Sequence, residues 1–514
     1  MFGKTLDRLG EWNPQLFREL KGRMTSRNIF TVLGISLVFQ FLLLAAFSNS
    51  YCDKYVDSIV SQCVEYHWEV NWLELFFTLG WILALLLFAG GAYSLSSDWA
   101  KEENRGTLYF IRLSPSPSQS ILLGKILGVP SVLYLAIALA IPLHLFSALM
   151  AGVPLFWILG LYVLVTAGSW LLFNMVLLNT MLTKVPYQAI ANSLLAAWLG
   201  SSYLGFLAFH FNGLPLEYRG VDWYWFTWNI GGNIKLGFCW MLITVVAGSY
   251  WIWKAINRRF KNPESTLISK QDSYVLVGGF QVWLLGLFWS FTNFEDDALL
   301  GMMFVMFAIN LGLLMLVVAA IAPHRQASID WARYHKDEHP LTHRNGKRSA
   351  KFQWIWGEKS PSIMAMTINL AIVAAVWLPW AMLWNVPGEQ KIQAIAGLIL
   401  SVNLIWIYTT IAQLMLFVKT PKPGRFAIGT LVAIMSLPAA LLSLLFESAQ
   451  PVWGWWMFSV FGSAWIALPE VSAFTVFLSL LGQFATIAGL SIALNSQLAK
   501  LGESESKALL DAAG

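Results

Sequence analysis

The richest set of ionisable and turn-forming side chains lies in the polar stretch from Asp98 to Lys125, between two hydrophobic segments. Ser97 and Asp98 can cap a short helix, acidic residues can occupy its first turns, and Gly106 followed by Thr107 can end it. Apolar residues then recur at mixed helical spacing before two Ser-Pro pairs stop the element. Such a segment suits non-covalent docking of a soluble partner. The alternative is a capped surface helix without a partner.

Motifs of nucleotide chemistry are absent from the sequence. Gly-Lys pairs begin at Gly3, Gly124 and Gly346, but none has both the upstream glycine and the following Ser or Thr of a P-loop. Nucleophile, zinc-protease and paired-cysteine motifs are also missing. We therefore expect no catalytic residue in this chain, and no cofactor bound by it.

A histidine series is the one pattern compatible with a metal. His335, His339 and His343 recur every four residues and would share one face of a helix. Pro340 interrupts that helix, so we expect no metal site.

The cysteines suggest at most a structural role. Cys52 and Cys63 share a segment predicted to lie outside the cell, where a disulfide between them could form. Spacing alone does not fix the geometry of such a bond, so free thiols remain the alternative. Cys239 lies in an apolar segment and is expected to act as a small hydrophobic residue.

Composition places the chain in the membrane. Of its 514 residues, 57% are hydrophobic, 15% aromatic and only 12% charged. Twelve apolar segments are close to or above the roughly 20 residues that cross a bilayer. They are residues 29–48, 72–95, 121–150, 155–182, 187–209, 234–253, 274–291, 298–321, 363–384, 392–418, 426–446 and 471–494. The sequence predicts an all-α polytopic membrane protein in contact with lipid, and nucleic acid is not an expected partner.

The distribution of basic residues predicts the orientation. Only Lys54, Arg219, Lys235 and Lys391 fall on the predicted outer side, which leaves 29 of the 33 Lys and Arg residues inside. Basic residues concentrate on the cytoplasmic side of membrane proteins. We therefore expect both termini in the cytoplasm, and residues 29–48 to be an uncleaved first span and not a signal peptide.

An amphipathic entry helix is predicted before the first span, within residues 1–28. Asn13 is a plausible N-cap and Pro14 suits the first helical position. Arg18, Lys21 and Arg23 would face water while apolar residues face the headgroups.

The chain is expected to consist of two six-span halves. Asn-Pro precedes the first and the seventh spans, Ser-Pro-Ser opens the third and the ninth, and aromatic outer segments near Trp223 and Trp453 suggest short interfacial helices. The predicted boundaries are 29–254 for the first half with a cytoplasmic loop at 96–120, 255–273 for a basic linker, 274–494 for the second half with a loop at 323–361, and 495–514 for a cytoplasmic tail. Common boundary pairs without a repeat are the alternative.

The spans lack paired charges near the membrane centre. His144 is the one ionisable side chain placed well inside a span. Ion-coupled transporters generally need intramembrane charges, because such charges are too costly to retain without a use. A secondary transporter is therefore disfavoured, and His144 is expected to be a satisfied interhelical side chain.

Three short motifs resemble one membrane-protein family. The run from Glu102 to Leu108 reads EENRGTL, Leu113-Ser114-Pro115 follows, and Ile121 to Lys125 ends in Gly-Lys. This pattern resembles the membrane subunits of the ABC type-2 exporter family, of the bacterial type. The order of the elements is similar as well. An entry helix is followed by two spans, a loop and four more spans, with a short outer helix before the sixth span.

The resemblance implies a permease in the bacterial inner membrane, energised by a separate cytoplasmic ABC-type ATP-binding subunit that uses ATP and magnesium. It assigns contact with that ATPase to the 98–125 loop, and the assigned residues are Glu102, Glu103, Arg105, Gly106, Thr107, Leu108 and Arg112. The cargo is unidentified, and an amphipathic or lipidic one fits the apolar spans. Pairing with a second copy of the chain is left open. The alternative function is a non-transporting membrane scaffold or assembly factor with exporter-like architecture.

Overall fold

The computed structural model describes the chain in two compact units. Unit 1 comprises residues 1–222 and 230–263, and unit 2 comprises residues 223–229 and 264–514. The described residues are 10–55, 63–183, 187–211, 223–289, 296–323, 325–337, 355–384, 387–420, 423–445, 468 and 471–501.

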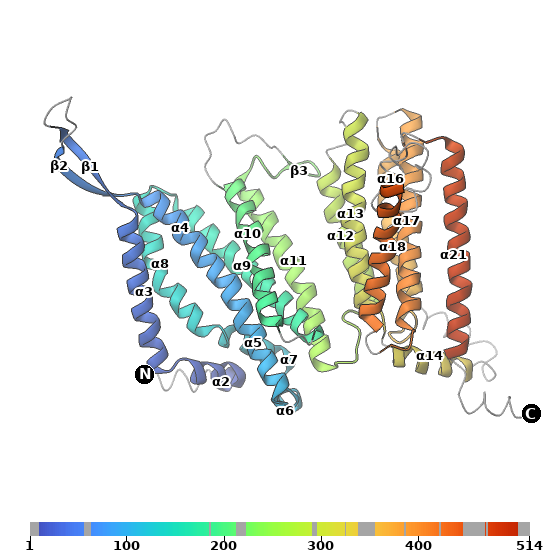
Figure 1. The fold of residues 1–514 in the computed structure, drawn as a ribbon, viewed down its shortest axis with the longest axis horizontal. Coiled ribbons are helices and arrows are strands. Elements are labelled where there is room, and N and C mark those ends of the chain that lie inside the picture. The colour runs from blue at the N-terminus through green and yellow to red at the C-terminus, as the bar shows by residue number, and fades with distance from the viewer. Residues whose placement is uncertain are drawn as a thin grey trace, which may run out of the picture. The chain divides into compact units, whose positions relative to one another are not determined.

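Unit 1 is a helical bundle with one β-hairpin (Figure 1). Its elements are α2 (Pro14–Arg23), α3 (Ser26–Ala46), β1 (Ser48–Tyr55), β2 (Cys63–Val70), α4 (Trp72–Leu85), the π-helical η1 (Leu86–Gly90), α5 (Gly91–Asn104), α6 (Thr107–Leu113), α7 (Ser118–Gly128), α8 (Ser131–Met150), α9 (Leu155–Leu182), α10 (Gln188–Phe211) and α11 (Ile234–Lys261).

Unit 2 is also built mainly of helices. Its elements are β3 (Tyr224–Trp225), β4 (Trp228–Asn229), α12 (Lys270–Phe288), α13 (Asp296–Ile321), α14 (Arg325–Asp337), α16 (Ile363–Met382), α17 (Gly388–Leu416), α18 (Pro423–Leu445) and α21 (Ala473–Leu501). Helix α17 packs against α16, α18 and α21, and α12 packs against α16.

Ten of the described helical segments are long and apolar enough to cross a membrane. The protein therefore has the character of a multi-pass, all-helical membrane protein, as its composition predicts. Predicted spans 274–291 and 426–446 coincide largely with helices α12 and α18, which are not among those ten. The count of twelve spans and the division into two equivalent halves remain predictions.

Two local expectations in unit 1 are wrong. Residues 121–150 are not one helix, because the chain breaks between α7 and α8 at Val129 and Pro130. Ser97 and Asp98 do not cap a new helix, because α4, η1 and α5 run on as one helical segment from Trp72 to Asn104. The polar residues up to Glu103 therefore belong to a membrane-spanning helix and not to a loop.

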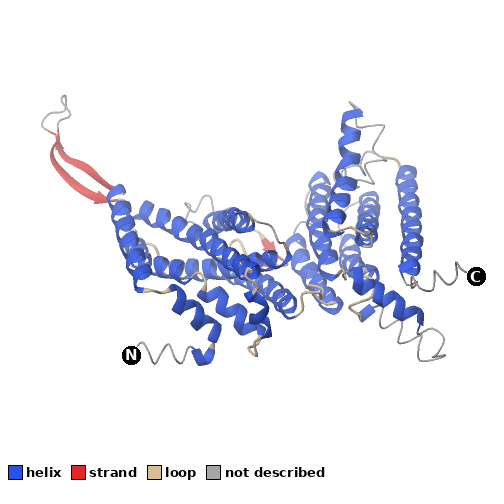
Figure 2. Ribbon diagram, turned by 60° about the horizontal axis from the view of Figure 1, so that its bottom comes forward, coloured by secondary structure: helices blue, strands red, loops and turns tan. Residues whose placement is uncertain are grey.

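The first predicted outer segment contains an antiparallel hairpin of β1 and β2, the red strands that project from unit 1 in Figure 2. In the backbone register Cys52 lies opposite Tyr66, and Cys63 lies opposite Tyr55. The two cysteines are thus not cross-strand partners, and a disulfide between them remains a prediction.

The aromatic segment between α10 and α11 forms a small hairpin instead of the expected short helix. Strands β3 and β4 pair with each other, and Phe226 at the turn has a positive φ of 53°. The hairpin packs on α12, where the Phe226 amide donates to the Gly286 carbonyl at 2.8 Å. The matching segment near Trp453 lies outside the described residues.

Buried polar side chains in unit 2 bond between helices. Gln281 of α12 donates to Asn310 of α13 at 2.8 Å and accepts from the Trp377 indole of α16 at 2.7 Å. Asn369 donates to Ser273 at 3.1 Å. These contacts make Asn310 and Asn369 interhelical hydrogen-bonding residues.

Candidate functional site

Helix α2 is anchored on α7 through two glycines. Asn13 caps α2 by accepting from the Leu16 amide at 2.9 Å, and its side-chain amide donates to the Ser120 carbonyl at 2.8 Å. A Cβ on Gly124 would come within 2.7 Å of the Leu16 nitrogen, and one on Gly128 within 2.5 Å of the Glu19 Cβ. Because these glycines are four residues apart on one face, they let the two helices approach closely. The cap and Pro14 at the first position agree with the sequence prediction.

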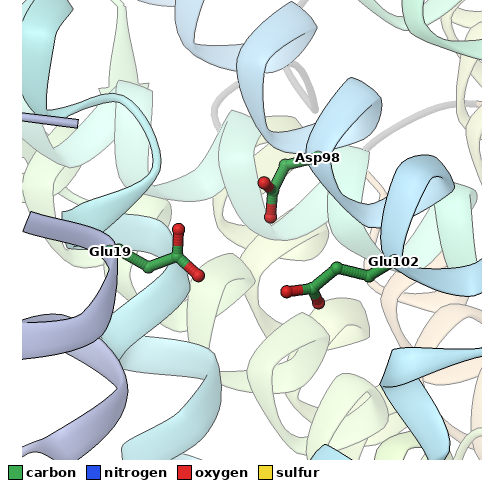
Figure 3. Close-up of side chains that lie close together, drawn as sticks. All are labelled: Glu19, Asp98 and Glu102. Atoms are coloured by element: carbon green, nitrogen blue, oxygen red, sulfur yellow. The ribbon is translucent and has the colours of Figure 1, made fainter. Parts of the chain in front are cut away.

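Three carboxylates from two helices converge beside this contact (Figure 3). Glu19 comes from α2, and Asp98 and Glu102 lie four residues apart on α5, with one oxygen of each within 4.8 Å of the others. The Lys125 ammonium of α7 lies among them, 2.8 Å from Asp98 and 2.7 Å from Glu102. Its distance to Glu19 is 3.6 Å. Lys125 is 1% exposed, so this ammonium is a buried counter-ion shared by three carboxylates.

Two arginines of α2 complete the charge cluster. Arg18 contacts Glu102 at 2.7 Å and Glu19 at 3.0 Å. Arg23 pairs with Asp98 and lies 3.3 Å from Glu19. The cluster therefore balances three carboxylates with three cations, and it joins α2, α5 and α7. We call these six residues, Arg18, Glu19, Arg23, Asp98, Glu102 and Lys125, the charge cluster.

The electrostatics of the cluster favour ion pairing over metal binding. The only acidic group of the described residues with metal-like spacing is Glu19, Asp98 and Glu102, and the Lys125 ammonium already occupies the space between them. Burial acts to lower the pKa of the Arg18 guanidinium, but Glu19 and Glu102 outweigh it, and the pKa is raised.

Helix α5 is braced by a buried polar network directly before Asp98. Asn192 of α10 donates to Ser96 at 2.8 Å and to Thr180 of α9 at 3.1 Å. Asn179 donates to the Asn192 carbonyl oxygen at 2.6 Å. This network ties α5 to α9 and α10, in addition to the ion pairs that tie it to α2 and α7.

Gly106 ends this rigid region and starts α6. Its φ is +72°, in the left-handed region that glycine adopts most readily, and this agrees with the predicted break. Thr107 begins α6, and its hydroxyl donates back to the Glu102 carbonyl at 3.2 Å. The direction of α6 is thus set by a turn that begins in the charge cluster.

Helix α6 has one buried face and one exposed apolar face. Leu108 and Ile111 pack into a core cluster that includes residues of α5, α7, α9 and α11. Tyr109, Phe110 and Leu113 are 63%, 76% and 83% exposed. Helix α6 is therefore held by one face and exposes three large apolar side chains on the other, which we call the exposed face of α6.

The basic residues near α6 differ in their surroundings. Arg112 lies over the Phe260 ring, with its guanidinium carbon 5.5 Å from the centroid. Burial lowers the pKa of Arg112, while Glu103 acts to raise it. Arg105 is exposed at the end of α5. Arg105 therefore lies exposed beside the exposed face of α6.

The structure brings together three of the site residues predicted from the sequence. Glu102, Arg18 and Arg23 meet in the charge cluster, whereas Lys21 is exposed and lies 5.8 Å from the Phe17 ring centroid. Sequence reasoning missed the roles of four residues, namely Glu19, Asp98 and Lys125 as cluster members and Gly128 as a packing position. Two signals were available: the four-residue spacing of Asp98 and Glu102, and that of Gly124 and Gly128.

The second predicted loop is described only in part. Helix α14 packs against α21, and Arg325 donates to the Phe417 carbonyl at 3.1 Å. Lys270, which precedes the predicted span 274–291, is buried and bonds Ser360 and the Pro361 carbonyl. His339 and His343 lie outside the described residues, so the histidine series has no structural account.

Fold and site together define a multi-pass helical membrane protein that carries a charge cluster and an exposed apolar face of α6 at one end of unit 1. Comparison with protein-family models, curated proteins and solved structures gives no significant match.

Proposed function

We propose that this chain is the permease subunit of an ATP-driven exporter of the ABC type-2 class, and that a separate ATP-binding subunit docks on α6. The observation that carries the proposal is the exposed face of Tyr109, Phe110 and Leu113, attached through Gly106 to the charge cluster. A partner that pushes on α6 would move a rigid body and not a loop, because α2, α5 and α7 are joined there by buried ion pairs.

The cluster also explains how a movement could reach the membrane. Glu102 and Asp98 belong to the same helical segment that begins at Trp72, so a displacement at α6 would be passed along a continuous span. Coupling between distant sites needs such contiguous rigid elements. In the proposed orientation both termini and α6 lie in the cytoplasm of a bacterial cell, and the cargo is amphipathic or lipidic.

The proposal is tested by capturing the tagged chain from membranes of its native host. We expect a Walker-type ATPase in the captured material, identified by mass spectrometry, together with ATP hydrolysis that the chain alone lacks. Phe110→Asp combined with Leu113→Asp places two charges on the exposed face and should remove the ATPase from the capture. Tyr187→Asp is the matched control, because Tyr187 is equally exposed at 76% but lies outside α6.

Capture of no ATPase with the unaltered chain would contradict the proposal and favour a membrane scaffold. Equal capture by the α6 variant and the unaltered chain would contradict the assignment of α6 alone. Size-exclusion profiles of all variants show whether the bundle remains folded.

A further inference from the structure

A cavity of about 620 Å³ lies in unit 1 at the end opposite to the charge cluster. Its wall includes the start of α4 and α9 and the end of α8 and α10, while the charge cluster lies at the other end of the 72–104 helical segment. The volume is within the roughly 300–1,000 Å³ of ligand-binding pockets. No residue of the proposed docking surface takes part in it.

The wall of this cavity is almost entirely apolar. Among the residues that line it, His144 is the one with an ionisable side chain. Its ring stacks on Phe76 with 4.7 Å between centroids, and its Nδ1 lies 2.7 Å from the Tyr162 hydroxyl. His144 is therefore held by the protein as an interhelical side chain, and the wall offers no charge to a polar ligand.

The cavity is open at the surface of the bundle. Leu164 and Leu207 in its wall are 1% and 2% exposed, whereas Leu73 and Phe156 are 47% and 48% exposed. The exposed members lie on α4 and α9, which are long and apolar enough to cross a membrane. The cavity is thus continuous with the outer surface of two helices of membrane-spanning character.

We infer that this cavity holds one acyl chain of a phospholipid from the surrounding bilayer. The wall favours an apolar occupant over ordered water, because Trp81, His144 and Trp157 are the only lining residues whose side chains carry polar atoms. An empty cavity would deprive its lining of dispersion contacts. Acyl chains are the apolar groups present at its opening, so a lipid tail is the occupant that fits. This inference rests on the membrane-spanning character of unit 1 and is independent of the proposed coupling to an ATPase.

Two glycine variants separate the cavity from the general lipid surface. Gly160 lines the cavity, and a Cβ there would make ordinary contacts, 3.4 Å from the Phe238 ring, so Gly160→Phe fills the space from α9. Gly205→Phe is the matched control, because nothing lies within 4 Å of its added Cβ and Gly205 is not in the wall. Ala208→Phe fills the same cavity from α10 and serves if Gly160→Phe does not fold.

The experiment uses the full chain in nanodiscs of phosphatidylethanolamine and phosphatidylglycerol that contain a phosphatidylethanolamine with a diazirine in one acyl chain. After illumination, we expect labelled peptides at Leu161 and Val165, which are half-buried side chains of the cavity wall, and at Phe41 on the exposed face of α3. Gly160→Phe should reduce the labelling of Leu161 and Val165 at least tenfold and leave that of Phe41 unchanged, while Gly205→Phe should change neither. Labelling of Phe41 without Leu161 in the unaltered chain, or unchanged labelling in both filled variants, would overturn the inference.

Discussion

Replacing Lys125 by methionine is the sharpest test of the charge cluster. Methionine keeps much of the length of the side chain but removes the ammonium that Glu19, Asp98 and Glu102 share. The variant would leave three carboxylates within 4.8 Å of one another, with only two arginines to balance them.

The expected loss is large because the remaining charge is buried. Breaking a buried ion pair by removing one partner costs about 3–5 kcal/mol, since it leaves a charge without compensation. For a unit of this size each kcal/mol corresponds to about 2–4 °C in Tm, so we expect Tm to fall by about 6–20 °C. The exposed Lys101 of α5 gives the matched control, and Lys101→Met should change Tm little.

A second substitution tests the physical reason. Glu102→Gln in the Lys125→Met background leaves two carboxylates, Glu19 and Asp98, with Arg18 and Arg23 as their partners. The double variant should recover about 0.5–3 kcal/mol of the loss, which is the range of coupling between contacting residues.

The assay is the fraction of monodisperse protein that survives heating in detergent, measured by fluorescence-detected size-exclusion chromatography. The reasoning is refuted if Lys125→Met behaves like Lys101→Met. It is also refuted if the double variant is less stable than Lys125→Met alone.

Three further predictions concern other positions. Gly106→Ala should lower stability by about 1–2 kcal/mol because of the left-handed φ of +72°, and an unchanged Tm would contradict the assigned turn. Gly124→Leu should displace α2, because even the Cβ of the new side chain would lie 2.7 Å from the Leu16 nitrogen. Tryptic cleavage within α2 should then accelerate several-fold. Gly22→Leu is the control and should leave the cleavage rate unchanged, because no atom lies within 4 Å of a Cβ added at Gly22. Burial lowers the pKa of Lys270 from 10.5 to about 8. Between these two pH values the unfolded chain holds the proton more often than the folded chain, so the free energy of unfolding should rise from about pH 8 towards 10.5. This rise should be smaller in Lys270→Met, and equal pH profiles of the two proteins would argue against burial of the ammonium.

Composition and local signals were enough for the class of fold and for several helix ends. Long apolar runs indicated membrane-spanning helices, Asn13 and Pro14 marked the start of α2, and Gly106 marked the end of α5. The hairpin of β1 and β2 carried a readable signal as well, since apolar and polar residues alternate from Val64 to Val70.

The remaining errors arise from contacts between residues far apart in the sequence. Asp98 and Glu102 resemble a helix start when read locally, yet they lie inside a helix because Lys125 and two residues of α2 neutralise them. The 121–150 segment reads as a single span, but thirty residues exceed what a bilayer needs, and the excess forms α7, on which α2 packs. No local pattern reveals which distant ammonium a carboxylate will meet.

The π-helical turn from Leu86 to Gly90 sets the direction in which the cluster carboxylates point. Each residue of an α-helix advances the side-chain direction by about 100°. A π turn accommodates one extra residue, so everything after Gly90 is rotated relative to a plain α-helix that starts at Trp72. If the same residues were wound as a regular α-helix, Asp98 and Glu102 would turn away from Lys125 by about a quarter of a turn. Deleting one residue such as Leu87 together with the π turn would keep both carboxylates in place, because the deletion and the regular winding cancel. The alignment of the charge cluster with the helical segment that begins at Trp72 thus depends on one extra residue, and a change of length there is tolerated only if the winding of the turn changes with it.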